Sequence, residues 1–443
     1  MSQSFPEYLE SMIVLFLNAT TADGYNPYRI TRAGIDWEVP EPENPWSNIG
    51  YWSDHQINYL IRLLERSAQY HPGRMGDLLN RAIFTHADVP YRIKGLDDLL
   101  ADPRDSIVFD EAAHLAAVER AAILGGDGRL LRSGDDLVRV TLAEKLLLLL
   151  AAKLVNVVPE GGVWMNTQRP EWNDANNALA GPGLSVVTLG YLRRYVAQLQ
   201  TLITESVSLS PELADLLSAL SEAVAQAPES WDDASRYAFL IRVGRLGERY
   251  RGRVFQGFSS HRTEVGHQEI QTLLGSVLGL LDRSLAANRR PDGLFHAYNV
   301  LAAADSLAQI RRLPLMLEGQ VSLLSSGVLN AQGASDLLAA LRTSQLYRAD
   351  QHSYLLYPDR QLPGFLVRNV IPADFAGSSE LFALLDERGD RRLAVRDGLD
   401  QWHFAAGLRN VRDVRAALDR LHGEPALAAP VAAERAAIIT LYE

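Results

Sequence analysis

Apolar residues recur three and four positions apart through most of the chain, a spacing that places them on one face of an α-helix. Several of these stretches carry start signals, among them Ser53 and Asp54 before the first. Thr141 with Glu144 has the form of a capping box, and Ser210 precedes Pro211, a residue that suits the first helical position. The pattern predicts a mainly α protein. The expected helices cover residues 54–66, 109–124, 141–155, 184–206, 211–227, 231–250, 267–287, 296–309, 313–326 and 334–343.

The connections between these helices are of two kinds. Some are short and polar, whereas the long ones are rich in aromatic residues, Gly, Pro and Asn and lie at 20–53, 156–183, 252–266 and 344–376. A toroid of helical hairpins has tight turns on one rim and long loops around a pocket on the other. A two-layer solenoid would share this asymmetry, but the chain shows no repeat of fixed period. We therefore expect an all-α toroid with the long loops on one rim.

A domain boundary is expected near residue 380. Residues 1–380 would form the toroid, and 381–443 a C-terminal extension packed on it. Within the extension, RRLAVRDGLDQWHF has an Asp-Gly turn between partly alternating residues, which predicts a small β-hairpin.

Composition narrows the classes of function. The net charge of −11 repels nucleic acid and anionic lipids but not a neutral sugar. The chain has no cysteine, which excludes disulfides, thiolate metal sites and cysteine nucleophiles and suits a reducing compartment. The N-terminal apolar stretch lacks a basic flank and is expected to be the first helix, and the run from Leu146 to Ala152 is far shorter than the ~20 residues of a membrane span. We expect a cytoplasmic protein with no nucleic-acid or membrane partner.

Tryptophans concentrate in two of the long loops. Trp37, Trp46 and Trp52 lie in the first, and Trp164 and Trp172 in the second, among amide and charged residues. An aromatic ring with polar neighbours suits a sugar, whose C–H face stacks while its hydroxyls find amide and carboxylate partners. The alternative is that these rings only pin the loops to the helices.

The second loop contains the best candidate for glycosidic chemistry. Cleavage of a glycosidic bond needs a carboxylic acid that protonates the leaving oxygen, and Trp172 could give Asp174 the partly apolar setting that keeps it protonated. The alternative is that Asp174 closes an Asx-turn or caps a short helix. The neighbouring candidates for substrate binding are Gln168, Arg169 and Glu171.

The first loop offers substrate-binding candidates. Asp54 stands at a helix start, where capping and contact with a sugar hydroxyl are compatible, and Trp52 lies beside it. Arg29, Asp36 and Trp37 could hold a second sugar ring, or Arg29 and Asp36 could form a surface ion pair.

The third loop combines donors that could bind phosphate before a helix, namely Ser259, Ser260, His261 and Arg262. A capped helix start with surface side chains would give the same pattern. Glu264, close behind them, is a candidate base.

The fourth loop supplies Asp350, the favoured partner carboxylate for Asp174, and Tyr354 as an aromatic substrate contact. Other chemistries lack their motifs, because the chain has no P-loop, no Gly-x-Ser-x-Gly elbow and no His-Glu-x-x-His. We expect no metal and no organic cofactor.

Two motifs resemble those of the six-hairpin glycosidase superfamily, most closely glycoside phosphorylases of the cellobiose phosphorylase type. They are Trp172-Asn173-Asp174 and the segment Gly50-Tyr51-Trp52-Ser53-Asp54-His55-Gln56. The resemblance implies an (α/α)6 toroid in which Asp174 is the general acid and Asp54 binds the non-reducing-end sugar.

These observations together predict a carbohydrate-active enzyme, either a glycoside phosphorylase or an inverting glycoside hydrolase, acting on an oligosaccharide or glycoside. Asp174 would be the acid, and the nucleophile would be inorganic phosphate as co-substrate or a water activated by Asp350 or Glu264. A non-catalytic glycan-binding or scaffold domain with the same aromatic cleft is the alternative from another class. The sugar, the linkage and the oligomeric state stay open.

Overall fold

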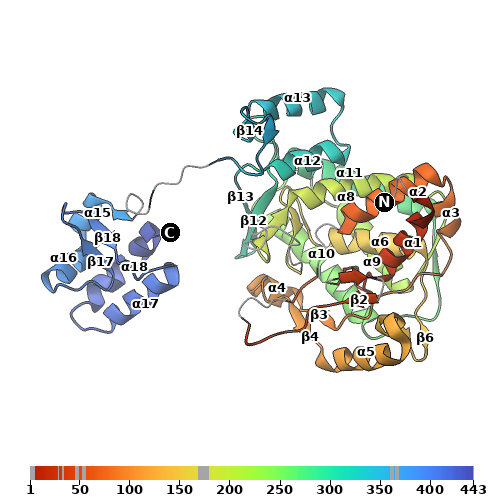
Figure 1. Cartoon of the computed structure of the whole chain (residues 1–443), viewed down its shortest axis with the longest axis horizontal. Coiled ribbons are helices and arrows are strands. Elements are labelled where there is room, and N and C mark those ends of the chain that lie inside the picture. The colour runs from red at the N-terminus through yellow and green to blue at the C-terminus, as the bar shows by residue number, and fades with distance from the viewer. Residues whose placement is uncertain are drawn as a thin grey trace. The chain divides into compact units, whose positions relative to one another are not determined.

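The structure is a computed structural model of the chain, and it describes residues 5–27, 29–31, 34–44, 49–51, 56–167, 179–359, 364 and 369–442. Two compact units divide the chain, Met1–Asp359 and Arg360–Glu443 (Figure 1). The division falls before the boundary at residue 380 that the sequence suggests. Each unit has a hydrophobic core of its own.

The prediction of an all-α fold is wrong. Helices hold about 51% of the residues and strands 15%, and the described residues form seven small sheets in addition to the helices. Most of these strands have only two or three residues, too few for an alternating pattern to stand out from a helical one in sequence. The helices of the N-terminal unit are α1 (Leu9–Asn18), α2 (Gln56–Tyr70), α3 (Arg74–Leu78), α4 (Leu96–Ala101), α5 (Glu111–Leu124), α6 (Leu142–Leu154), α8 (Val186–Leu202), α9 (Pro211–Ala225), α10 (Asp233–Val254), α11 (His267–Ala286), α12 (Leu317–Ser326) and α13 (Ala331–Arg342), with 3-10 turns η1 (Pro6–Tyr8) and η2 (Gly125–Arg129).

Helix α6 forms the centre of the N-terminal unit. Every one of its side chains is buried, and α1, α2, α8, α9, α10 and α11 contribute to the same core (Figure 1). Thr141 caps its start, since the Thr141 hydroxyl accepts a hydrogen bond from the Glu144 N–H at 3.1 Å. The Glu144 carboxylate does not complete a capping box. It accepts instead from the N–H of Ser210, the residue before α9.

An antiparallel five-stranded sheet runs in the order β13-β12-β9-β8-β7. It corrects the expected helix at 296–309, because β12 and β13 form a hairpin there, with Asp305 and Ser306 at positive φ in the turn. The spacing of Leu and Ala in residues 296–309 resembles that of a helix. In the structure, however, β12 pairs with β9, and Leu301 of β12 packs with Leu240 of α10. The strands of this sheet are β7 (Val157–Val158), β8 (Gly162–Trp164), β9 (Gly183–Ser185), β12 (Tyr298–Ala304) and β13 (Leu307–Arg312).

The other strands of the N-terminal unit form two-stranded antiparallel ribbons between the helices. They are β1 (Arg29–Thr31) with β2 (Gly34–Asp36), β3 (Tyr91–Ile93) with β4 (Ile107–Phe109), β5 (Arg132–Ser133) with β6 (Asp136–Leu137), β10 (Val207–Leu209) with β11 (Thr263–Val265), and β14 (Tyr347–Arg348) with β15 (Ser353–Tyr354).

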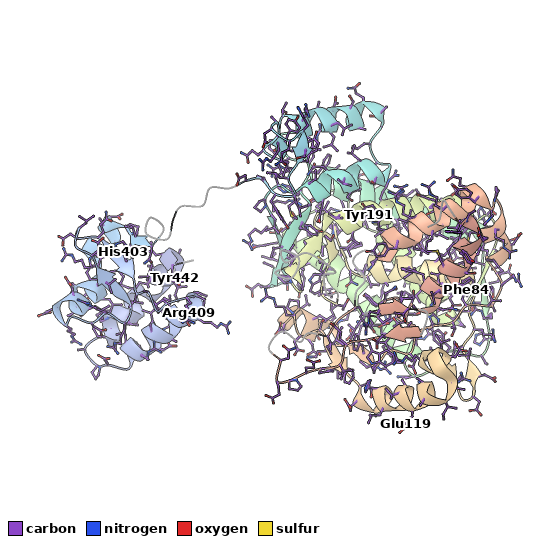
Figure 2. All side chains as sticks on the ribbon, viewed as in Figure 1. Phe84, Glu119, Tyr191, His403, Arg409 and Tyr442 are labelled. Atoms are coloured by element: carbon purple, nitrogen blue, oxygen red, sulfur yellow. The ribbon has the colours of Figure 1, made fainter. Side chains whose placement is uncertain are left out.

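The C-terminal unit packs helices against a three-stranded sheet of order β16-β18-β17. Strands β17 and β18 confirm the hairpin predicted around the Asp-Gly turn. The last helix is tied back to the unit, because the Tyr442 hydroxyl donates to the Leu408 carbonyl at 2.7 Å and its ring meets Phe404 edge-on (Figure 2). Its elements are β16 (Val370–Ile371), α15 (Ala373–Ser378), α16 (Glu380–Glu387), β17 (Ala394–Arg396), β18 (Trp402–Phe404), α17 (Val411–His422) and α18 (Ala428–Tyr442).

Candidate functional site

A cavity of about 330 Å³ opens in the N-terminal unit where stretches far apart in sequence meet. Its walls come from the first long loop, from the segments around β3 and β5, and from the end of α10 with the third long loop. The lining residues lie at 21–23, 51, 87–89, 92, 131–133, 138 and 254–258.

Asp23 is the buried acid of this cavity. Its side chain is 4% exposed, and its Oδ1 accepts a hydrogen bond of 2.5 Å from the Thr21 hydroxyl. Its Oδ2 has no hydrogen-bond partner among the described residues. Leaving a buried polar atom unpaired costs about 1–3 kcal/mol, so the fold carries this acceptor at a cost that a ligand could relieve.

Burial raises the pKa of the Asp23 carboxyl, while the Thr21 hydrogen bond and the positive charges of Arg251 and Arg92 oppose the rise. A carboxyl whose pKa is raised by burial beside a cavity has the properties of a functional group. It could accept hydrogen bonds when ionised or donate a proton when neutral.

The backbone around Asp23 packs against helix α6. Gly24 adopts φ +90°, and a Cβ there would stand 2.7 Å from the Ala152 Cβ, so only glycine allows the loop to approach the helix so closely. The fully buried Lys145 donates from Nζ to the Thr20 carbonyl at 2.9 Å and lies 2.9 Å from His86 Nδ1. Burial lowers the pKa of both Lys145 and His86 well below their usual values, so neither needs to hold a charge in the core.

Aromatic residues join the first long loop to the second. The Tyr25 and Tyr51 rings stack with centroids 4.9 Å apart, and the Asn156 side-chain amide donates to the Tyr25 hydroxyl at 2.9 Å. The Tyr51 N–H donates to the Thr167 carbonyl at 3.2 Å. The two loops predicted to share a rim therefore touch beside the cavity.

The described parts of the second loop on either side of residues 168–178 are joined by hydrogen bonds. The Gly181 N–H donates to the Met165 carbonyl at 2.9 Å, and the Trp164 indole N–H donates to the Gly181 carbonyl at 2.7 Å. Residues 168–178 connect these anchored ends. The predicted site residues that lie outside the described residues are Trp52, Asp54, Gln168, Arg169, Glu171, Trp172 and Asp174.

Arg29, Asp36 and Trp37 each contact other residues of the protein. Arg29 and Asp36 form an ion pair of 2.5 Å across β1 and β2. The Trp37 ring is buried, and its indole N–H donates to His114 Nδ1 of α5 at 3.0 Å. Their contacts match the structural alternative, a surface ion pair and a ring that pins the loop; none of the three lines the cavity.

The third loop, with its predicted phosphate donors, reaches the cavity only at its start, through Phe258 and the residues before it. The Ser259 N–H and hydroxyl both donate to Glu212 Oε1, at 3.1 and 2.5 Å. Arg262 pairs with the buried Glu144 at 2.5 Å and donates to the Ser208 carbonyl. Ser260 and His261 are exposed, and Glu264 is exposed on β11, paired with Ser208 of β10.

The fourth loop lies away from the cavity. Asp350 pairs with Arg348 at 2.6 Å on the surface, and Tyr354 pairs with Tyr347 across the β14–β15 ribbon. Figure 1 places β14 beside α13, far from β3. The structure thus brings together the first three long loops and leaves the fourth apart.

Asp23, Arg92 and Gln256 are three of the polar residues that line the cavity, and the sequence-based predictions gave them no role. A local signal existed for Asp23, since Thr-Thr-Ala-Asp-Gly places a carboxylate before a glycine that can take positive φ. Nothing local marks Arg92 or Gln256.

Among the described residues, no group of three or more His, Asp or Glu side chains is placed to hold a metal ion. No helix within the described ranges is long and apolar enough to cross a membrane.

The cavity, with its buried carboxyl, aromatic walls and paired charges, is suited to a polar organic ligand. Comparison with known proteins relates one part of the chain to carbohydrate-active enzymes. Residues 362–443 match the family model described as GH149 phosphorylase insertion domain 2. The match spans almost the whole C-terminal unit and supports a relationship of the chain to glycoside phosphorylases. No curated protein matches the chain.

Proposed function

We propose that the chain is a glycoside phosphorylase or a major part of one, which transfers a glycosyl unit from an oligosaccharide to inorganic phosphate. The observation that carries the proposal is the match of the C-terminal unit to an insertion domain of phosphorylases. The Trp172-Asn173-Asp174 motif, found independently in the sequence of the N-terminal unit, supports the same class.

In this proposal Asp174 is the general acid. It donates its proton to the glycosidic oxygen as the bond from that oxygen to the anomeric carbon breaks, and a phosphate oxygen forms the new bond from the opposite face. The products are an inverted sugar 1-phosphate and the shortened glycan, and the proton of the attacking hydrogen phosphate returns to Asp174 through solvent. Phosphate is itself a nucleophile, so the reaction needs no second carboxylate as base.

The contacts between the loops support placing this chemistry near the cavity. Met165 and Gly181 hold both ends of the segment that contains Asp174, and Thr167, the last described residue before that segment, binds Tyr51 of the cavity wall. Substrate bound in the cavity would therefore lie close to Thr167, the residue that precedes the segment containing Asp174.

The experiment is a screen of glucosyl, galactosyl and mannosyl oligosaccharides with and without inorganic phosphate, read by chromatography of the products. The proposal predicts sugar 1-phosphate only when phosphate is present, and oligosaccharide synthesis when sugar 1-phosphate and an acceptor sugar are supplied. Release of free sugar without phosphate would identify a hydrolase instead. Saccharide binding with no product in either direction would support a glycan-binding domain.

A further inference from the structure

We propose that the cavity at Asp23 is a saccharide-binding subsite in which the Asp23 carboxylate accepts hydrogen bonds from sugar hydroxyl groups. The inference rests on the proposed function for its ligand class, since a phosphorylase of this kind must hold a sugar. It assigns a binding role to a residue that neither the sequence motifs nor the family match points to.

The carboxylate of Asp23 is built into the cavity wall as an acceptor. Thr21 holds Oδ1 by a hydrogen bond of 2.5 Å, which fixes the orientation of the side chain. Oδ2 is buried and lacks a partner among the described residues, and Asp23 is one of the residues that line the cavity. A hydroxyl group is the neutral donor that such an oxygen needs.

The charges that line the cavity distinguish a neutral sugar from an ion. Arg92 and Arg132 contribute two positive charges, and Asp23 and Asp88 contribute two negative ones. Arg120, outside the cavity, pairs with Asp88 at 2.6 Å. An anion would meet the Asp23 carboxylate and a cation would meet the two guanidinium groups, whereas a polyol meets both donors and acceptors.

Arg92 and Arg132 already donate hydrogen bonds to the protein backbone. They are therefore better suited to recognising a hydroxyl group than to binding a phosphate. Arg92 donates to the carbonyls of Val89 and Tyr91 and lies over the Phe255 ring, 4.4 Å from its centroid. Arg132 donates to the Asp135 carbonyl. A phosphate site normally offers guanidinium groups with their donors directed at the ligand.

The size and the apolar walls of the cavity agree with this ligand. Its volume of about 330 Å³ is at the lower end of the range for small-molecule sites, which suits a mono- or disaccharide. Phe255 and Phe258 line it and supply apolar surface for the C–H face of a sugar ring. The stack of Phe258 on His86, with centroids 5.4 Å apart, holds that wall in place.

The test is calorimetric titration of the whole chain, without phosphate, with glucose, galactose, mannose and cellobiose. At least one sugar should bind, and Asp23→Asn should weaken it about 10- to 100-fold, the effect of losing a hydrogen bond to a charged group. Monodeoxy analogues of the bound sugar should show which hydroxyl Asp23 reads, because the analogue lacking it should lose affinity for the wild type but not for Asp23→Asn.

Glu212→Gln is the matched control. Glu212 is as buried as Asp23 and also has an unpartnered carboxylate oxygen, but it does not line the cavity, so its variant should bind sugar as the wild type does. Melting temperatures of both variants check that they are folded. The inference is overturned if no sugar of the set binds, or if Asp23→Asn binds within twofold of the wild type.

The assays also separate this inference from the proposed function. Phosphate-dependent turnover with unchanged sugar affinity in Asp23→Asn would reject the subsite and keep the phosphorylase. Sugar binding that depends on Asp23, with no turnover in either direction, would keep the subsite and reject the phosphorylase.

Discussion

Residues 20–26 of the first loop and 258–264 of the third both carry clusters of polar side chains, and the structure uses the two clusters differently. In the first, the protein leaves the Asp23 acceptor without a partner beside an open cavity. In the third, Ser259 and Arg262 already donate to the buried carboxylates of Glu212 and Glu144.

The difference shows that polar composition alone is a weak indicator of a binding site. A loop rich in donors can be a structural device that neutralises carboxylates in the core, as Arg262 does for Glu144. A buried group that lacks a partner beside a cavity is one that a bound ligand could satisfy.

The largest expected effect concerns Asp174 in the second loop, the loop that contacts the first. Asp174→Asn should reduce turnover by about 10²–10⁴-fold, because the leaving oxygen would depart without its proton. Kinetics on a natural oligosaccharide measure the loss, and a substrate with an activated leaving group should recover much of it. In contrast, Glu264→Gln in the third loop should retain phosphate-dependent turnover, because phosphate attacks the anomeric carbon without a general base. Normal turnover by Asp174→Asn would remove Asp174 as the acid and make Glu171 the next residue to test.

Gly24 in the first loop and Gly257 in the third both adopt positive φ, so alanine substitutions there compare how tightly the two loops are packed. A Cβ at Gly24 would clash with Ala152 at 2.7 Å, whereas a Cβ at Gly257 would meet nothing within 4 Å. Gly24→Ala should therefore cost about 3 kcal/mol or more in unfolding free energy, from backbone strain plus overpacking. Gly257→Ala should cost about 1–2 kcal/mol, from backbone strain alone. Urea denaturation compares the variants, and equal losses would contradict the tight seating of the first loop on α6.

Arg262 tests the structural role of the third cluster. Arg262→Ala should lower the unfolding free energy by about 1–3 kcal/mol, because it leaves the buried Glu144 without its charged partner. The partial exposure of Arg262 keeps the loss below that of a fully buried pair. Since Ser259 and Arg262 are already engaged, any rise in melting temperature with added phosphate should be equal in the variant and the wild type. A rise that only the wild type shows would restore the predicted phosphate site at 259–262.

The smallest expected effect is the pH dependence of stability from Asp23. Its pKa is raised in the folded state by burial, so the folded protein binds a proton that the unfolded chain has already lost. The stability from this proton is present below the ordinary pKa of aspartate and is lost as the pH rises through the raised value. Within that window the wild type should lose up to about 1.4 kcal/mol per pH unit relative to Asp23→Asn. Parallel pH profiles of the two proteins would contradict the raised pKa.

Much of the helical framework could be predicted because its signals are local. The apolar spacing at 211–227 and the Ser210-Pro211 start correspond to α9, and the pattern at 267–287 corresponds to α11. The hairpin of β17 and β18 was predictable for the same reason, since an Asp-Gly turn is encoded in two adjacent residues. The stretch at 296–309 failed because its apolar spacing resembles that of a helix, whereas β12 pairs with β9, more than 100 residues earlier in the chain.

The candidate site was predictable only in part. The sequence identifies the loops, and the contacts between the first and second loops agree with the predicted common rim. It does not show which polar groups find partners, because those partners lie far away in sequence. Glu144 and Arg262 meet only through packing, and so do Thr20 and Lys145. Trp37 illustrates the same limit, since its indole N–H donates to His114 of α5, a partner 77 residues away in the sequence.

The bonds that hold the first loop also set the order in which it can form during synthesis. The Ala22 carbonyl accepts from the Tyr250 hydroxyl, 228 residues later in the chain, and Thr20 depends on Lys145. At a translation rate of ~5–20 residues per second, residues 20–26 emerge from the ribosome roughly 10–50 s before Tyr250 is made. A chain released before Tyr250 lacks this hydrogen bond and the lining residues at 254–258, so it should lack the cavity.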